Sequence, residues 1–140
     1  MLSVLQERKD DAARAPQPGL RDLERLVEEV RHEGLAVDLE IDGVPVELPP
    51  GLDLSAYRIV QEGLADARRH PGRGEAHVRV KYAADELQLE VVDERARETG
   101  DGLSAMRERV AVYGGRLETG PAPAGGFRVC ARLPLAGASR

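Results

Sequence analysis

The sequence predicts a two-layer α+β sandwich, in which three helices cover one face of a mixed, mostly antiparallel sheet. Three segments repeat apolar residues at three- and four-residue spacing, which is typical of amphipathic helices. The segments between them alternate apolar and polar residues, which is typical of half-buried strands. With 140 residues, 41% of them apolar and 32% charged, the chain has the size and balance of one globular domain.

The composition excludes several classes of protein. A net charge of −5 argues against a general nucleic-acid binder, because such proteins carry an excess of basic residues. The single cysteine, Cys130, excludes an internal disulfide and a cysteine-based zinc site, and it fits a reducing compartment. No stretch reaches the roughly 18 uninterrupted apolar residues of a membrane-spanning helix. We therefore expect a soluble, cytoplasmic domain.

The N-terminal part of the chain predicts a linker, a helix and two strands. Residues 1–18 predict the end of a preceding element followed by a Pro-rich linker. Apolar residues at helical spacing predict a helix from Gly19 to Gly34. Alternation over residues 35–42 predicts a strand, and residues 44–48 are expected to return as a second strand after a turn at Gly43.

The rest of the chain predicts two helices and two pairs of strands. A long helix is expected over about residues 52–70, because the apolar pattern runs to His70 and Pro71 ends it. A loop over 71–75 follows, and a third helix is expected over 102–113. For the polar segment 94–101 we expect high mobility and no helix. The remaining strands are predicted by alternation at residues 77–82, 87–92, 116–119 and 127–133.

The long helix carries the first candidate site. Glu62 and Asp66 are four residues apart, so both carboxylates share one helix face, and Arg69 and His70 lie one turn further along. Carboxylate oxygens suit Mg²⁺, and the basic pair beyond them suits phosphate. The alternative is a solvated charged face with intrahelical ion pairs, and the spacing alone favours that alternative.

Two further candidates lie at the ends of elements. Asp93 ends an apolar strand, where it can accept a hydrogen bond from a ligand amine or serve only as a turn residue. Gly100 and Gly102, followed by Leu103, open the third helix. Glycines at a helix N-terminus let backbone N–H groups approach a phosphate. An ordinary N-terminal helix cap has the same sequence pattern, so both interpretations stay open.

In this order, the three clusters and several short stretches resemble the ATP-binding catalytic domain of sensor histidine kinases, within the GHKL ATPase superfamily. More narrowly, the sequence is similar to the nitrate-sensor type. The likeness covers about residues 16–135. It implies a dimerisation-helix end and linker at 1–18, an ATP-binding domain at 19–135 and a tail at 136–140. The stretches that carry it are Pro16-Gln17-Pro18-Gly19, Ala56-Tyr57-Arg58-Ile59-Val60-Gln61-Glu62, Gly102-Leu103-Ser104-Ala105-Met106-Arg107-Glu108-Arg109, Tyr113-Gly114-Gly115 and Gly125-Gly126-Phe127-Arg128-Val129.

The resemblance implies roles for the candidate residues. Glu62 matches the glutamate of the family's N box, which assists phosphoryl transfer. Asp66 stands where the family has an asparagine that holds Mg²⁺. Arg69 and His70 match positions that face the phosphates, and Asp93 matches the aspartate that receives the adenine amino group.

The glycine boxes match only in part. The second box survives as Gly100 and Gly102 with Leu103, and the resemblance implies that they contact the nucleotide. Arg95 and Arg97 replace both glycines of the first box. Arginine cannot replace a glycine that approaches a ligand or has φ > 0 without strain, although a guanidinium can also pair with phosphate. We therefore expect weak or undetectable ATP binding by this sequence, and recovery when Asp66 is replaced by Asn and both arginines by Gly.

The implied reaction is transfer of the ATP γ-phosphoryl group, with Mg²⁺, to a histidine on a dimerisation domain that this chain lacks. The implied partners are that domain of the same protein and a response regulator, with no direct contact to nucleic acid. The resemblance is compatible with a membrane-anchored homodimer whose cytoplasmic part includes this chain. The alternative is a degenerate interaction module that keeps the fold and has lost nucleotide binding.

Overall fold

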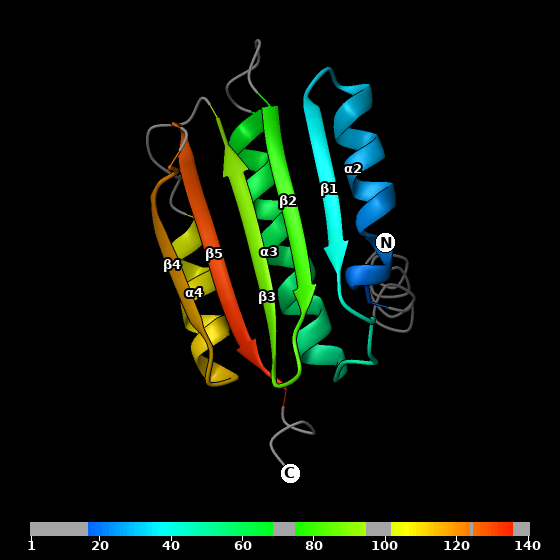
Figure 1. Ribbon diagram of the computed structural model, residues 1–140, viewed down its shortest axis with the longest axis vertical. Coiled ribbons are helices and arrows are strands. Elements are labelled where there is room, and N and C mark those ends of the chain that lie inside the picture. Colours follow the sequence, from blue (N-terminus) through cyan, green and yellow to red (C-terminus); the bar gives the residue numbers. More distant parts are fainter. Residues whose placement is uncertain (1–16, 69–74, 95–101, 124, 136–140) are drawn as a thin grey trace, which may run out of the picture.

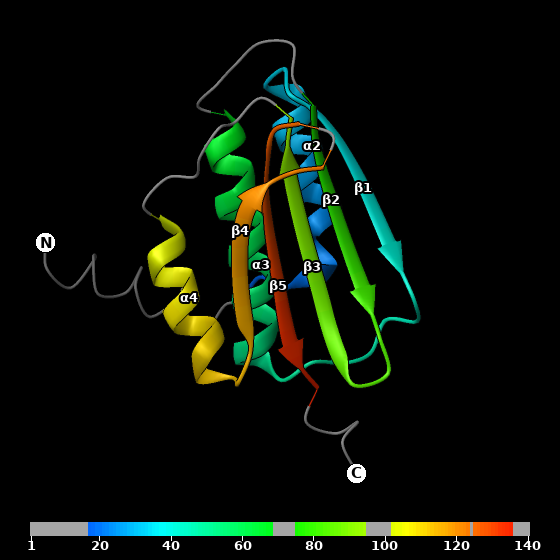
Figure 2. The same ribbon diagram turned by 60° about the vertical axis from the view of Figure 1, so that its left-hand side comes forward.

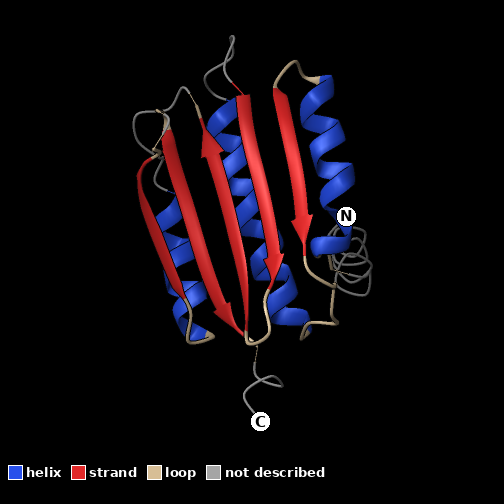
Figure 3. Cartoon of the chain, in the orientation of Figure 1, coloured by secondary structure: helices blue, strands red, loops and turns tan. Residues whose placement is uncertain are grey.

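A computed structural model of the chain describes residues 17–68, 75–94, 102–123 and 125–135, and within the helices it leaves out the side chains of residues 66, 102, 103 and 105. The expected two-layer α+β sandwich is confirmed: one sheet packs against a layer of helices (Figures 1 and 3). In chain order the elements are η1 (Leu20–Asp22), α2 (Leu23–His32), β1 (Ala36–Asp42), α3 (Pro50–Arg68), β2 (Glu75–Tyr82), β3 (Glu86–Asp93), α4 (Gly102–Val112), β4 (Arg116–Pro121) and β5 (Phe127–Pro134).

The sheet has the strand order β1-β2-β3-β5-β4 and is mixed, as expected. Only β1 and β2 run parallel, and the other three pairs are antiparallel. A parallel pair needs a crossover, and α3 supplies it between β1 and β2. The predicted hairpin between β2 and β3 is confirmed, with Tyr82 paired to Leu87.

The core lies between the helices and one face of the sheet. Strand β3 alternates strictly between half-buried and buried residues, so its inner face is fully covered. Four apolar residues of α2 are buried against the same layer, as its helical spacing predicts. Among the largest fully buried side chains are Leu23, Val27, Ile59, Leu64, Leu87, Leu89 and Leu133.

The outer face of the sheet carries charged side chains. Arg79 of β2 lies 3.1 Å from the Glu40 carboxylate and 3.4 Å from that of Asp42, both on β1. Arg128 of β5 lies 3.3 Å from Glu90 of β3. Acidic and basic side chains of neighbouring strands therefore pair on this face, and no described helix covers it (Figure 2).

The predicted strand at residues 44–48 is wrong. The structure has no strand there, and the chain instead runs below the sheet into α3 (Figure 1). Pro45 lacks the N–H that a ladder needs, and the side chains of Val44 and Val46 are exposed rather than packed. Edge strand β1 is therefore left without a hairpin partner among the described residues.

Other boundaries differ by a few residues. Helix α3 begins at Pro50, which suits the first position of a helix, and is described to Arg68, so its predicted end at His70 lies outside the described residues. Glu75, expected in a loop, is the first residue of β2. The predicted helix at 19–34 begins with the short 3₁₀ turn η1 before α2.

Candidate functional site

Three elements that carry candidate residues share one end of the sandwich. Strand β3 ends there, the second half of α3 lies beside it, and α4 begins there (Figure 2). Helix α3 packs on β3 and on α4, so it links the strand to the second helix. The sequence therefore brings Glu62, Asp93 and Gly102 to the same end of the domain.

Asp93 is the buried carboxylate of this end. It is the last residue of β3, its exposed fraction is 9%, and it lies on the strand face that is covered by the helices. Its backbone pairs with Ala76 on one side and Phe127 on the other, so the position of the residue is fixed from both neighbouring strands. A carboxylate held in this way can accept a hydrogen bond from a ligand amine.

Gly126 approaches the backbone of Asp93 from the turn that precedes β5. Its φ is +90°, and a Cβ at this position would lie 2.2 Å from the Asp93 carbonyl oxygen and 2.6 Å from the Glu94 Cα. Only glycine accepts both this conformation and this contact. Gly126 of the Gly125-Gly126 stretch thus supports the strand end that holds Asp93.

Gly63 brings α3 close to β3. A Cβ at Gly63 would lie 2.9 Å from Val91 Cγ1, and Val91 is two residues before Asp93 on the same strand face. From this contact, α3 advances about 4.5 Å to Asp66 and β3 about 6.6 Å to Asp93, toward the same end. Glu62, whose side chain is half-buried, precedes Gly63 in α3, so the helix that carries it packs against the strand that ends at Asp93.

The phosphate end of the predicted site is described only by its backbone. Asp66 lies in α3 without a described side chain, and Gly102 and Leu103 are the first residues of α4. Arg69, His70, Arg95, Arg97 and Gly100 lie outside the described residues. The expectations for the segment 94–101 concern residues that, apart from Glu94, lie outside them as well.

No protein-family model matches the chain. Sequence comparison finds sensor histidine kinases. YxjM of Bacillus subtilis is 30% identical over 123 residues, covering 84% of this chain and 30% of YxjM. NarS of Mycobacterium tuberculosis is 31% identical over 116 residues, covering 75% of this chain and 26% of NarS. LnrJ of Bacillus subtilis is 28% identical over 122 residues, covering 84% of this chain and 30% of LnrJ.

Solved structures give the same fold. The catalytic domain of histidine kinase ThkA matches with a TM-score of 0.63 at 16% identity, and the match covers 84% of this chain and 94% of that domain. The histidine kinase domain of the Erythrobacter litoralis EL346 blue-light activated kinase matches with a TM-score of 0.61 at 20% identity, covering 83% of this chain and 60% of that domain.

The chain is a relative of the sensor histidine kinases and carries the fold of their catalytic domain. The resemblance stated from the sequence is thereby confirmed, as is the GHKL-type architecture. The chain spans about a third of the length of the curated kinases that it matches. Within the described ranges, no helix of this histidine kinase-like domain combines the length and apolar character that crossing a membrane requires.

Two features of this histidine kinase-like domain were missed in the sequence. The first is a link between the Pro-Gln-Pro-Gly stretch and α3. The Asp53 carboxylate accepts a hydrogen bond from the Leu20 N–H at 2.9 Å, and the Asp22 carboxylate accepts one from the Gly19 N–H at 3.0 Å. Asp53 is an acidic residue in the first turn of α3. Acidic residues are common at that position in helices, so the sequence alone does not indicate this contact.

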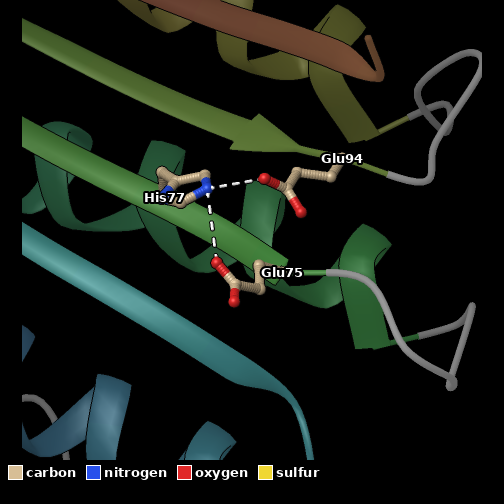
Figure 4. Close-up of side chains that lie close together, drawn as sticks. All are labelled: Glu75, His77 and Glu94. Carbon is tan, nitrogen blue, oxygen red and sulfur yellow. Dashed lines mark hydrogen bonds and ion pairs between the residues drawn. The ribbon is translucent and has the colours of Figure 1, made fainter. Parts of the chain in front are cut away.

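The second missed feature is a cluster on the outer face of the sheet (Figure 4). Glu75, His77 and Glu94 point toward one another, with His77 Nε2 lying 3.0 Å from Glu94 Oε2. The hydrogen bond to Glu94 raises the pKa of His77, nearby Glu75 and Asp38 add to this, and partial burial opposes it. The same hydrogen bond lowers the pKa of Glu94. The sequence pattern alone predicts His77 only as a strand residue.

Proposed function

We propose that this chain is the ATP-binding catalytic domain of a two-component sensor histidine kinase, with nucleotide affinity weakened by its own substitutions. The observation that carries the proposal is the buried Asp93 carboxylate at the end of β3, in a domain with the fold of histidine kinase catalytic domains. A ligand bound there lies at the end of the sandwich where the C-terminal half of α3 packs beside β3 and α4 begins (Figure 2).

Asp93 suits the adenine amino group, because a carboxylate is an acceptor and the amino group is a donor. A charge-assisted hydrogen bond in a partly dry site also discriminates against ligands without a donor at that position. Gly126 supports this role, since its close backbone contact holds the strand end that carries Asp93. The residues present therefore fit the adenine end of ATP.

Bound ATP would supply the γ-phosphoryl group, and Mg²⁺ would neutralise charge on the phosphates. In this proposal Asp66 holds Mg²⁺, Glu62 assists the transfer, and Arg69 and His70 bind the phosphates. Gly100, Gly102 and Leu103 would offer backbone N–H groups at the start of α4.

We further propose that the acceptor is a histidine on a dimerisation domain of the same protein, and that a response regulator receives the phosphoryl group. The similarity to sensor histidine kinases over 84% of this chain supports this assignment. Residues 1–18 would then be the end of a dimerisation helix and a linker, and 136–140 a tail. The protein would be a homodimer anchored to the membrane, with this domain in the cytoplasm.

The competing function is a non-catalytic interaction module of the same fold, and the loss of both first-box glycines favours it. Asp66 also adds a negative charge beside the phosphates, which at about 4 Å and an effective dielectric near 20 opposes binding by on the order of 4 kcal/mol unless Mg²⁺ offsets it. The two functions differ in whether ATP reaches Asp93 at all.

An NMR titration of the ¹⁵N-labelled chain with Mg·ATP separates them. Weak binding at the proposed site should shift the amide resonances of Asp93, Gly126 and Glu62 progressively at millimolar ATP. Amides on the outer sheet face, such as that of Glu40, serve as the internal control and should stay in place. No shift at Asp93 at saturating Mg·ATP would favour the interaction module.

A further inference from the structure

The cluster of Glu75, His77 and Glu94 lies on the face of the sheet opposite to the buried Asp93. Glu75 and His77 are two residues apart on β2, so both side chains project from the same face. The Glu94 N–H donates a hydrogen bond to the Glu75 carbonyl oxygen at 3.0 Å. The main chain therefore holds the two glutamates side by side at the end of the β2–β3 pair.

The three side chains present donor atoms at distances that suit a metal ion. His77 Nε2 lies 3.0 Å from Glu94 Oε2 and 3.7 Å from Glu75 Oε2. One donor atom from each residue can be chosen so that all three lie within 4.8 Å of one another. A tetrahedral ion with bonds of about 2.1 Å needs donor atoms about 3.4 Å apart, and the two distances from the imidazole lie on either side of this value.

Asp38 supplies an independent feature of a histidine metal site. It is paired with His77 in the β1–β2 register, and its Oδ2 lies 3.8 Å from His77 Nδ1. Histidine ligands of metals usually direct the second ring nitrogen to a carboxylate, which fixes the tautomer. Without a metal, Nε2 donates its proton to Glu94; when a metal displaces that proton and Nδ1 keeps its own beside Asp38, the Nε2 lone pair faces the two glutamates.

We propose that Glu75, His77 and Glu94 bind a divalent first-row transition metal ion of the Zn²⁺ class, with Asp38 orienting the imidazole. The imidazole ligand favours such ions over Mg²⁺ and Ca²⁺, which prefer oxygen donors alone. The side chains of His77 and Glu94 are 39% and 47% exposed, so an ion can enter from solvent and keep water in its remaining position. This inference does not depend on the proposed function, because the donors lie on the other face of the sheet from Asp93.

The ion would join β2 to the residue that follows Asp93. Glu94 is the first residue after β3, so a ligand bond to its carboxylate would hold the end of that strand from the outer face. Metal binding would therefore stabilise the strand end that carries Asp93 without contacting a ligand bound to it.

Isothermal titration of the nucleotide-free chain with ZnCl₂, at about pH 7.5 in a non-coordinating buffer, tests the site. We expect one Zn²⁺ per chain, and about tenfold or greater loss of affinity in both His77→Gln and Glu94→Gln. His32→Gln removes an exposed histidine at the end of α2 and Cys130→Ser removes the thiol, and both should bind Zn²⁺ like the unmodified chain. MgCl₂ should give no binding heat at the same concentrations.

A folding control keeps this test decisive. Thermal unfolding of each metal-free variant should remain cooperative, and Zn²⁺ should raise the melting temperature of the unmodified chain but not that of His77→Gln. Absence of Zn²⁺ binding by the folded, unmodified chain would show that the cluster is only an ion pair. Equal Zn²⁺ affinity in folded His77→Gln would place any bound ion elsewhere and overturn the assignment.

Discussion

Gly126 lies against the backbone of Asp93, close enough that a Cβ would stand 2.2 Å from the Asp93 carbonyl oxygen. Because the carbonyl belongs to a paired strand, it cannot move aside as a flexible side chain would. The contact makes the conformation of the 125–127 turn and the position of Asp93 depend on each other. Substitutions at Gly126 therefore test how the strand end is built.

Gly126→Ala should destabilise the domain by roughly 2 kcal/mol or more, because it adds a backbone clash to the strain of positive φ. Gly125→Ala is the matched control for strain alone, since Gly125 has φ +101° and nothing within 4 Å of its Cβ position. Gly120→Ala, also with open space, should change stability by only about 0.5 kcal/mol. Urea unfolding measures all three, and equal losses for Gly125→Ala and Gly126→Ala would show that the contact with Asp93 is unimportant.

The hydrogen bond between Asp53 and the Leu20 N–H should stabilise the start of the domain. Asp53→Ala should lower the free energy of unfolding by about 1–2 kcal/mol, because a part-buried N–H loses its charged acceptor. Asp53→Asn keeps an acceptor oxygen and should recover most of this loss. Hydrogen exchange at the Leu20 amide provides the local measurement. Unchanged protection of that amide in Asp53→Ala would contradict the role.

In the presence of a chelator, His77 should titrate above the ordinary histidine pKa. Its hydrogen bond to Glu94 is the main cause, with further contributions from the charges of Glu94, Glu75 and Asp38. NMR titration of the ring resonances measures this directly. Glu94→Gln should bring the pKa of His77 back toward its ordinary value, and an unshifted His77 in the unmodified chain would contradict the ion pair.

The same shifts fix the sign of the pH dependence of stability. The raised pKa of His77 adds stability below the pKa of unfolded histidine, and this is lost as pH rises through the folded value. The lowered pKa of Glu94 adds stability above the pKa of unfolded glutamate, and this is lost as pH falls through the folded value. The pair therefore stabilises most between the two ordinary pKa values, and Glu94→Gln should lower stability in that window and weaken the pH dependence on either side of it. A stability maximum outside this window, unaffected by Glu94→Gln, would contradict this pairing.

Sequence patterns predicted the layers and most elements because apolar periodicity reports which faces are buried. They failed at residues 44–48, where the alternation of Val44 and Val46 was real but Pro45 and the path into α3 prevented pairing. Whether a segment pairs at the edge of a sheet depends on the path of the chain into the next element. The apolar periodicity of a few residues carries no information about that path. The strand-end position of Asp93 was predictable because β3 alternates without interruption.

The outer cluster could not be predicted in the same way. Glu75 and His77 are neighbours on one strand face, but Glu94 and Asp38 reach them only through the register with β3 and β1. The strand register cannot be deduced from the local sequence pattern. The Asp53 contact has the same origin, because it joins residues 33 apart in the chain. Both needed tertiary structure.

The central claim is that Asp93 receives the adenine of ATP in a site weakened by Asp66, Arg95 and Arg97. Calorimetric titration with Mg·ATP tests this claim most directly. It compares three proteins: the unmodified chain, a triple variant, and the triple variant with Asp93→Asn added. The triple variant carries Asp66→Asn, Arg95→Gly and Arg97→Gly. We predict at least about tenfold tighter binding by the triple variant than by the unmodified chain, and loss of that gain with Asp93→Asn. Micromolar affinity in the unmodified chain, or affinity in the triple variant that is indifferent to Asp93→Asn while all proteins remain folded, would contradict the account.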